Sequence, residues 1–374
     1  MKTARIIGTG SYLPAKEETN IDLYKNKDIK ENFNVKNVED KYSEKVRNML
    51  SKNNFSNYNL DEKELFNALL FDAWAKELTG VEKRHIYDND FNNLENFIGS
   101  TENMAFEASK QALDAADLSA KDLDFIIMAT FTEKYIIPNP ACNLAKLLGI
   151  NCDGRTINAA CSGFVYGLRE AYKTIISGDA NNVLVVASET LRDVTLMRDP
   201  KTAVLFADGA GAAVLTADNK GILGYYGNMI PSEHIILRKI YPEYPKQEIL
   251  KEHLGYVVMG GGSKVLSKAV RAMEDASLGA LQKTNLSIKD IAYIIPHQAN
   301  QRITDGLIKK LEVKRERFIE TIKNFGNTSA ASVGLGLDKA IRGELENIKI
   351  ERGDKLLLTA VGAGYTLAGV IIEY

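Results

Sequence analysis

The chain of 374 residues has few cysteines and almost no excess of charge. Three cysteines cannot form a disulfide framework at this length, which predicts a reducing compartment. The 47 basic and 49 acidic residues nearly balance, so no field is strong enough to attract nucleic acid or a membrane non-specifically. No apolar run approaches the roughly 18 residues that span a bilayer, and residues 1–8 are too polar for a signal peptide. We expect a soluble cytoplasmic protein that binds neither nucleic acid nor a membrane.

The scarcity of histidine and cysteine also argues against a metal centre. The four histidines and three cysteines are separated along the chain and give no metal-ligand spacing. Gly8 and Gly10 are followed by Leu13 and Pro14, so the third glycine of a dinucleotide-binding fingerprint is missing. The sequence therefore predicts no metal and no cofactor.

Nearly continuous apolar segments alternate with helical periodicity after residue 100. Strands of this kind are buried on both faces between layers of helices, which is typical of an α/β fold. The expected strands are residues 125–129, 183–187, 292–295 and 355–359.

The second part of the chain repeats the pattern of the first. Residues 118–127 align without gaps on residues 286–295, and residues 160–168 are echoed by residues 328–337. Because the order of the motifs is the same, we predict two related halves, which are residues 1–218 and residues 219–374. Equivalent loops of the two halves should meet on one shared face, where a site is expected.

Residues 24–70 interrupt the first half. They contain no glycine, and their apolar residues recur at helical spacing. We expect a helical insertion near the N-terminus that lies over the body as a cap.

Of the three cysteines, Cys161 has the sequence surroundings that most favour a reactive thiol. It lies among small residues, between the strand-like residues 155–157 and a predicted helix. The positive end of a helix dipole lowers a thiol pKa and favours the nucleophilic thiolate. A buried structural thiol is the alternative for any cysteine, and Cys142 and Cys152 fit that alternative better.

Two polar residues and a turn are expected near Cys161. His297 directly follows the predicted strand 292–295, where ligand sites gather in α/β proteins. Asn327 lies in a loop that nearly matches the Cys161 loop in the repeat, although a helix N-cap would also explain it. The glycine-rich turn 362–364 could offer backbone N–H groups to an oxyanion. A tight turn without that function is the alternative.

Several ordered motifs resemble those of β-ketoacyl-[acyl-carrier-protein] synthase III. The resemblance covers about residues 1–23 and 70–374. It implies the thiolase fold, in which two related halves form a five-layered αβαβα core, and a homodimer that acts in fatty-acid synthesis. The motifs are residues 160–164, 206–214, 297–300, 326–332 and 362–366.

The resemblance also implies catalytic roles. Cys161 would take an acyl group from acyl-CoA or an acyl carrier protein. His297 and Asn327 would assist the decarboxylation of malonyl carrier protein and stabilise the enolate oxygen. The backbone N–H groups of Cys161 and Ala363 would form an oxyanion hole.

Further residues are implied to contact the substrates and the carrier protein. Gly362 and Gly364 flank the oxyanion donor. Trp74 matches an aromatic residue that stacks on the CoA adenine, although Leu78 stands where an arginine is usual. Ile137 stands where a bulky aromatic residue often closes the partner's acyl pocket. The basic residues expected to contact the acidic carrier protein, or else to form a solvated helix face, are Arg302, Lys309 and Lys310.

The sequence therefore predicts a decarboxylating Claisen condensation of an acyl thioester with malonyl carrier protein through an acyl-cysteine. One alternative is a specialised relative that transfers the acyl group to another nucleophile or condenses β-ketoacyl units in secondary metabolism. The other is a non-catalytic ketosynthase-like partner subunit, against which the presence of Cys161, His297 and Asn327 argues.

Overall fold

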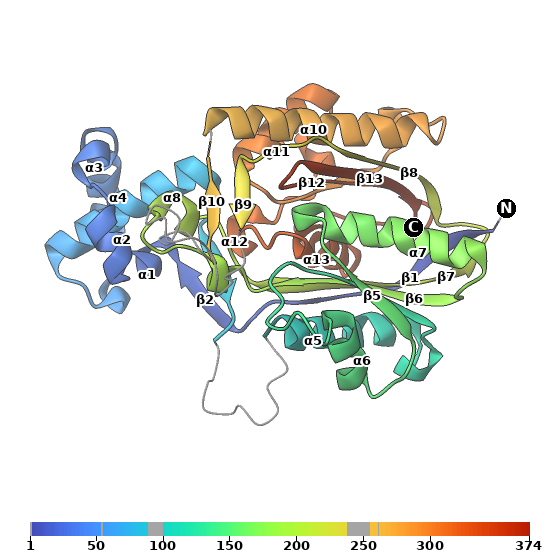
Figure 1. Ribbon diagram of the computed structural model, residues 1–374. Helices are drawn as coiled ribbons and strands as arrows, with labels where there is room; N and C mark the ends of the chain where they lie inside the picture. The colour runs from blue at the N-terminus through green and yellow to red at the C-terminus, as the bar shows by residue number, and fades with distance from the viewer. Residues whose placement is uncertain (1, 54, 89–99, 238–254, 261) are drawn as a thin grey trace.

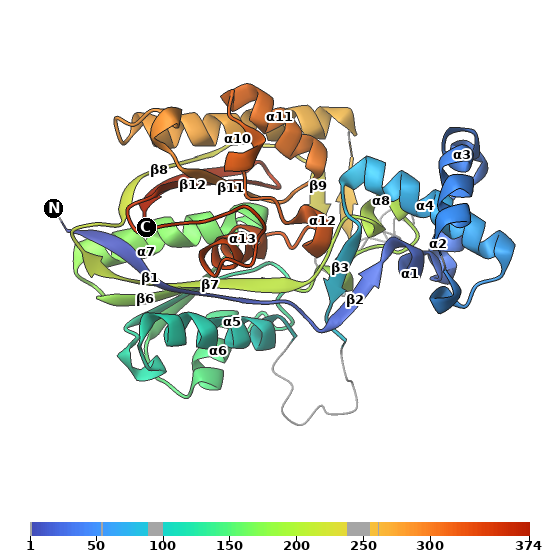
Figure 2. The same cartoon turned by 180° about the vertical axis from the view of Figure 1, so that it is seen from behind.

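The core of the protein consists of five alternating layers of helices and sheets (Figures 1 and 2). The computed structural model describes residues 2–374 except 54, 89–99, 238–254 and 261. The first sheet has the strand order β1-β7-β6-β4-β5 and the second has the order β11-β12-β13-β8. This arrangement is the αβαβα core that the resemblance implied.

The first sheet is formed by β1 (Thr3–Tyr12), β7 (Gly209–Asp218), β6 (Asn182–Glu189), β4 (Phe125–Ala129) and β5 (Asp153–Ile157). The second sheet is formed by β11 (Tyr293–Pro296), β12 (Lys355–Gly362), β13 (Thr366–Glu373) and β8 (Ile222–Met229). The chain passes from the first sheet to the second between β7 and β8. This is where the sequence predicted the boundary between the two halves.

Helices occupy the three remaining layers. The outer helices α5 (Ser100–Ala116) and α6 (Pro140–Leu148) cover the first sheet, and α10 (Ser263–Gln282) and α11 (Gln301–Leu311) cover the second. The helices α7 (Gly163–Ser177) and α13 (Ala331–Ile341) lie between the sheets. Every residue of β4 is buried, which is the reason for its uninterrupted apolar sequence.

The predicted internal repeat is present in the backbone. The 3-10 turns η3 (Ala120–Asp122) and η6 (Ile288–Asp290) both begin with a serine–aspartate capping box, and β4 and β11 follow them. Asp117 and Asn285, which precede these turns, both have φ of 55°. The equivalent positions are shifted by 168 residues, the same separation that divides Cys161 from Ser329.

The insertion is helical, as predicted. Residues 24–70 contain α2 (Lys27–Asn32), α3 (Lys36–Lys52) and the first half of α4 (Glu62–Thr79), and α1 (Asn20–Tyr24) leads into them. We call these helices the helical cap. Their apolar residues form a core of their own, which also includes Ala203 and Val204 at the end of α8 (Pro200–Ala203). The cap therefore buries its apolar stripes against itself and against this short body helix.

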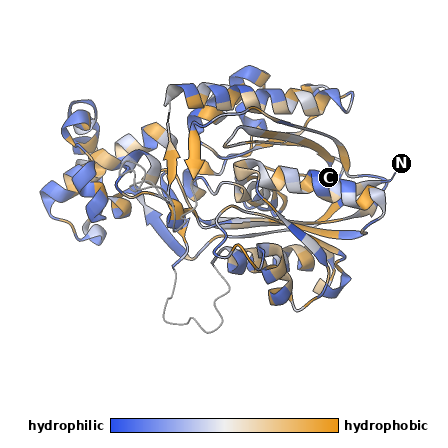
Figure 3. Cartoon of the chain, viewed as in Figure 1, coloured by the Kyte–Doolittle hydropathy of each residue, from blue (hydrophilic) through white to orange (hydrophobic). Residues whose placement is uncertain are grey.

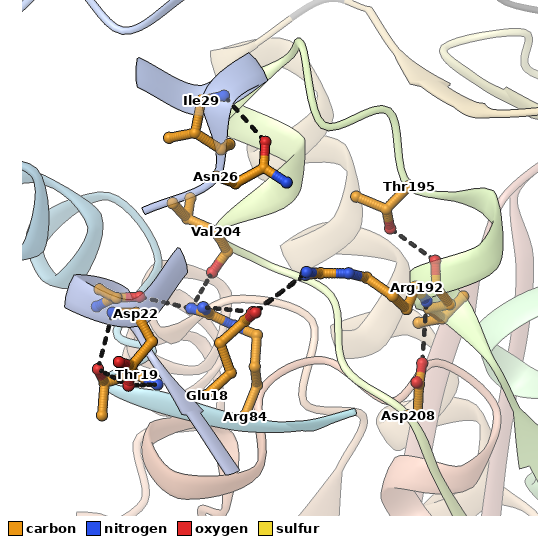
Figure 4. A network of polar contacts seen from close by, with 12 residues as sticks. Glu18, Thr19, Asp22, Asn26, Ile29, Arg84, Arg192, Thr195, Val204 and Asp208 are labelled. Carbon is orange, nitrogen blue, oxygen red and sulfur yellow. Dashed lines mark hydrogen bonds and ion pairs between the residues drawn. The ribbon is translucent and has the colours of Figure 1, made fainter. Parts of the chain in front are cut away.

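A buried arginine joins the helical cap to the body (Figure 4). Arg84, in β3 (Lys83–Ile86), has no exposed surface, and its guanidinium donates to Asn20 Oδ1 and to the carbonyl of Val204. Glu18, in β2 (Lys16–Thr19), lies 3.8 Å from Arg84 and accepts two hydrogen bonds of 3.0 Å from Arg192. Burial lowers the pKa of Arg84 to about 10, which leaves it charged at neutral pH.

Close contact between the first sheet and the central helices requires glycine at one position of β7. A Cβ atom on Gly211 would lie 2.4 Å from the backbone nitrogen of Leu335 in α13. By contrast, a Cβ atom on Gly336 of the same helix would be 3.5 Å from its nearest neighbour. The approach of β7 to α13 therefore depends on the missing side chain of Gly211.

We predict that Gly211→Ala lowers the free energy of unfolding by about 2–3 kcal/mol, because it overpacks the contact between β7 and α13. Gly336→Ala is the matched control and should change stability by less than about 1 kcal/mol. Denaturant unfolding of the two variants measures the difference. Equal stability of both variants would contradict the packing of these layers.

Candidate active site

Cys161 lies at the tip of the loop that joins β5 to α7. The tip is the 3-10 turn η4 (Ala160–Ser162), and Ala160 adopts a left-handed φ of 46°. Asn158 Oδ1 accepts a hydrogen bond of 3.2 Å from the Ala160 N–H and so supports this turn. The thiol is thereby placed at the carboxyl end of the first sheet and at the start of α7, as the sequence predicted.

The turn between β12 and β13 packs directly against the Cys161 loop. A Cβ atom on Gly362 would lie 2.6 Å from the carbonyl oxygen of Ala159 and 2.9 Å from the nitrogen of Cys161, so glycine is required here. The Thr366 hydroxyl donates a hydrogen bond of 2.8 Å to the same Ala159 carbonyl. Residues 363–364, which follow Gly362, line the same cavity as Cys161.

His297 follows β11 and is fully buried. Its backbone N–H donates to the carbonyl of Thr359, and its Nδ1 lies 2.7 Å from Ser332 Oγ in α13. The Gln298 N–H donates to the same Ser332 oxygen at 3.3 Å. Burial lowers the pKa of His297 to about 3, so the imidazole is neutral.

Asn327 is held by both its backbone and its side chain. Its N–H donates to the carbonyl of Leu205, and its carbonyl accepts from the N–H of Ala207, both at 3.0 Å. Oδ1 accepts a hydrogen bond of 2.8 Å from the Ser329 N–H, and Nδ2 donates one of 3.2 Å to the carbonyl of Ala299. These bonds join the Asn327 loop to the loop that carries His297, two residues before Ala299.

Ser329 completes the connection to Cys161. Its hydroxyl donates a hydrogen bond of 3.2 Å to Cys161 Sγ, and its backbone has a left-handed φ of 48°. The loop of the first half that carries Cys161 and the loop of the second half that carries Ser329 are therefore in contact at their tips. The three residues expected to be catalytic belong to one connected set, although the bond to the thiol comes from Ser329.

The thiol pKa differs from the expectation. Burial raises the pKa of Cys161 to about 11, and the charge of Glu189 adds to this rise. The hydrogen bond from Ser329 opposes it. The prediction of a lowered pKa was therefore wrong for the resting protein, because desolvation of the thiolate outweighs the helix terminus.

A cavity of about 920 Å³ opens at the thiol. Much of its wall is apolar, and β9 (Ile235–Leu237) and β10 (Val257–Met259) contribute one side, which Figure 3 colours as hydrophobic. The other large apolar lining residues are Phe131, Ile136, Val194 and Phe206. The cavity is therefore suited to an apolar group attached to the sulfur.

A buried carboxyl group lies behind this cavity. Glu189 Oε2 accepts hydrogen bonds from the hydroxyls of Thr130 and Thr132, at 3.0 and 2.6 Å, and from the Phe131 N–H at 3.3 Å. Within the described part of the chain, Glu189 Oε1 has no hydrogen-bond partner. Burial raises the pKa of Glu189 to about 8, so this side chain is mainly a neutral acid at pH 7.

The remaining predicted contact residues lie outside the connected set. The ring of Trp74 packs against Phe33 and Phe71 of the helical cap, with centroid distances of 5.0 and 5.5 Å. Ile137 is 86% exposed, whereas its neighbour Ile136 lines the cavity of its own chain. Trp74 as an adenine contact and Ile137 as a contact across a dimer stay predictions.

The basic residues on α11 differ in the contacts that they make with the rest of the chain. Arg302 donates a hydrogen bond of 2.9 Å to the carbonyl of Glu77 near the end of α4. Lys310 forms an ion pair of 3.3 Å with Glu274, whereas Lys309 is exposed.

The other two cysteines differ from the expectation of buried thiols. Cys142 is exposed on α6 and Cys152 is partly buried, and both line a second cavity of about 530 Å³. The prediction was wrong for Cys142 because it occupies the outward face of an amphipathic helix. Among the described residues, no cluster of three potential metal ligands occurs. Likewise, no helix in the described ranges is long and apolar enough to cross a membrane.

The sequence interpretation missed Ser329, Ser332 and Glu189. The repeat contained a signal for Ser329, because the alignment of residues 160–168 with 328–337 places it opposite Cys161. Ser332 and Glu189 gave no comparable signal, since their contacts come from strands and helices far apart in the chain.

Known proteins resemble this chain along its length. The family model described as 3-oxoacyl-[acyl-carrier-protein] synthase III matches residues 156–227, and its C-terminal counterpart matches residues 281–374. A β-ketoacyl-[acyl-carrier-protein] synthase III from Xanthomonas campestris pv. campestris is 35% identical, covering 99% of this chain and 98% of the relative. One from Clostridium perfringens is 36% identical over 81% of this chain and 90% of that relative. The crystal structure of the Aquifex aeolicus VF5 enzyme superposes with a TM-score of 0.76 and 34% identity, covering 99% and 100% of the two chains.

The five layers and the thiol at the joint of two related halves define a thiolase-fold acyltransferase that acts as a condensing enzyme. Full-length similarity then decides among such enzymes. This chain belongs to the β-ketoacyl-[acyl-carrier-protein] synthase III family, and the predicted resemblance and fold class are confirmed.

We predict that the contribution of Glu189 to protein stability falls as pH rises from about 5 to about 8, because burial holds this side chain neutral in the folded state. A raised folded pKa contributes stability below the unfolded value of 4.5, and this contribution is lost as pH approaches about 8. Glu189→Gln should reduce the loss, since the amide cannot ionise. Melting temperatures at pH 5, 6.5 and 8 test this. Identical pH profiles of the wild type and the variant would contradict it.

Proposed function

We propose that Cys161 accepts the acyl group and that condensation with malonyl carrier protein then takes place at the same thiol. The observation that carries this proposal is the position of Cys161, at the touching tips of the two halves and on the wall of an apolar cavity. Attack of the sulfur on an acyl thioester forms the Cys161–acyl bond and releases the donor thiol, which takes up the thiol proton. The N–H groups of Cys161 and Ala363 are proposed to stabilise the oxyanion of this step.

We assign the second half-reaction to His297 and Asn327. Breaking the carbon–carbon bond of the malonyl group releases CO₂ and leaves its electron pair as an enolate, which attacks the acyl carbonyl and displaces the Cys161 thiolate. The developing negative charge needs hydrogen-bond donors that do not themselves protonate the carbanion. A neutral imidazole and a rigid carboxamide meet this requirement.

The donor and its acyl chain are a further part of the proposal. We propose acyl-CoA or acyl carrier protein as the donor, with Trp74 near the adenine and the turn of Gly362 and Gly364 beside the thioester. The apolar lining favours a primer larger than acetyl. Leu78, in place of the usual arginine, contacts the core of the helical cap and offers no charge to a nucleotide.

We further propose a homodimer in the cytoplasm. Strand β5 is at the edge of the first sheet, and the side chains of residues 153–155 are exposed. An open edge favours pairing with a second strand. Residues 135–137 are apolar and exposed, and a second copy of the chain would bury them. In such a dimer, Ile137 would reach the partner's cavity. The few cysteines agree with a reducing compartment.

The relatives named synthase III favour this function over the alternatives of a specialised acyltransferase and a non-catalytic partner subunit. Arg302, Lys309 and Lys310 are proposed to receive the acidic carrier protein on the exposed side of α11, where Lys309 is the least engaged with its own chain.

We predict that Cys161→Ala abolishes acylation of the protein by acyl-CoA, because it removes the proposed nucleophile. Cys142→Ala and Cys152→Ala are matched controls and should retain acylation. Peptide mass mapping after incubation with a panel of acyl donors locates the added mass. Label on Cys142 or Cys152 in the wild type would refute the assignment.

We predict that His297→Ala and Asn327→Ala still take up the acyl group but decarboxylate the malonyl thioester about a hundredfold more slowly, as expected when an oxyanion donor is lost. Release of labelled CO₂ measures the second half-reaction, and the mass added at Cys161 measures the first. Wild-type rates of CO₂ release in both variants would exclude these residues from the step.

We predict that Lys309→Glu raises the KM for malonyl carrier protein several-fold at low salt and less at high salt, because steering by surface charge is screened. The KM for malonyl-CoA should stay unchanged. Lys121→Glu, which reverses another exposed lysine, is the control. An equal loss with both malonyl substrates would argue against a carrier surface on α11.

A further inference from the structure

The hydroxyl of Ser329 is bonded to the sulfur of Cys161. The Oγ–Sγ distance is 3.2 Å, and Ser329 has no exposed surface. A buried hydroxyl beside a thiolate acts as a charge-assisted donor, which favours the charged form. The contact therefore has a direction, in which serine donates and sulfur accepts.

The backbone at Ser329 adopts a strained conformation that holds the hydroxyl beside the sulfur. Its φ of 48° is left-handed, a conformation that serine adopts rarely. The Asn327 Oδ1 atom accepts a hydrogen bond of 2.8 Å from the Ser329 N–H and so fixes the turn. A strained residue held by its neighbours and aimed at a nucleophile indicates a role in the chemistry.

The internal repeat places Ser329 in the same position as Cys161. The two residues are 168 positions apart, the shift that relates the other repeated elements. The loop tip that carries the nucleophile in the first half thus carries a hydroxyl donor in the second. The two tips touch across the joint between the halves.

We propose that Ser329 is a catalytic residue that stabilises the negative charge on the Cys161 sulfur by hydrogen bonding as the thiol proton passes to the donor thiol. The inference rests on the proposed role of Cys161 as acyl acceptor. Ser329 keeps its own proton throughout. The thiol proton leaves with the donor thiol, as in the acyl transfer described above.

The thiolate needs such a donor because its other surroundings disfavour charge. Burial raises the pKa of Cys161 to about 11, and Glu189 on β6 raises it further. The other ionisable groups on the cavity wall are Glu133, Lys134 and Asp193. The Ser329 hydroxyl is in direct contact with the sulfur.

The test compares Ser329→Ala with Ser329→Gly in the full-length protein. Both variants lack the hydroxyl, but glycine adopts a left-handed φ without strain and alanine does not. The rate of iodoacetamide addition to Cys161 is measured by peptide mass mapping from pH 6 to pH 11. This reaction forms the S–C bond and releases iodide, so it needs no acyl substrate. Failure of the Ser329 inference is therefore distinguishable from failure of the proposed condensation.

We expect both variants to react about tenfold more slowly between pH 7 and pH 10, where the alkylation rate follows the thiolate fraction. This is the change expected when a hydrogen bond to a charged group is lost. Ser109→Ala removes another buried serine hydroxyl, bonded to the carbonyl of Ala105, and should leave the rate unchanged. Unchanged rates in both Ser329 variants would overturn the proposal. A slower reaction in the alanine variant alone would also overturn it, because the effect would then come from the backbone.

Discussion

The contact between the tips of the two halves is the constraint on which the site depends. Cys161 comes from the first half and Ser329 from the second, and their side chains are 3.2 Å apart. The third loop of the site, residues 362–364, packs against residues 159–161 because Gly362 has no side chain. Similarly, the missing side chain of Gly211 lets α13, which follows Ser329, pack against the first sheet. Glycines at these close contacts therefore help to set the geometry of the site.

The environment of the site favours neutral groups. His297, Glu189 and Cys161 all have pKa values displaced toward their uncharged forms, and burial is the main cause for each. A condensing enzyme must generate a carbanion without protonating it, so neutral groups beside the thiol suit the chemistry. The same burial raises the pKa of the thiol, and the hydrogen bond from Ser329 opposes that rise.

Local patterns predicted the fold well, because the repeat, the buried strands and the helical cap are each encoded in contiguous residues. The same patterns selected Cys161, His297 and Asn327 as candidates, since each follows or precedes a recognisable strand or helix, and their catalytic roles stay predictions. The patterns could not predict the thiol pKa or the contacts of Ser329, Ser332 and Glu189. These properties depend on burial and on partners such as Thr132 and Gln298, which only the folded chain brings near. The outward position of Cys142 was missed because an apolar stretch does not reveal which side of a helix faces solvent.

A disulfide trap tests most directly whether the two tips meet in solution. In Ser329→Cys the two sulfur atoms would take the places of atoms now 3.2 Å apart, within reach of a bond. Mild oxidation should link Cys161 to residue 329, as read by non-reducing peptide mass mapping, and should block acylation until a reductant is added. If both thiols stay free in the folded variant and alkylate independently under the same oxidant, the two loops do not touch and the account of the site is wrong.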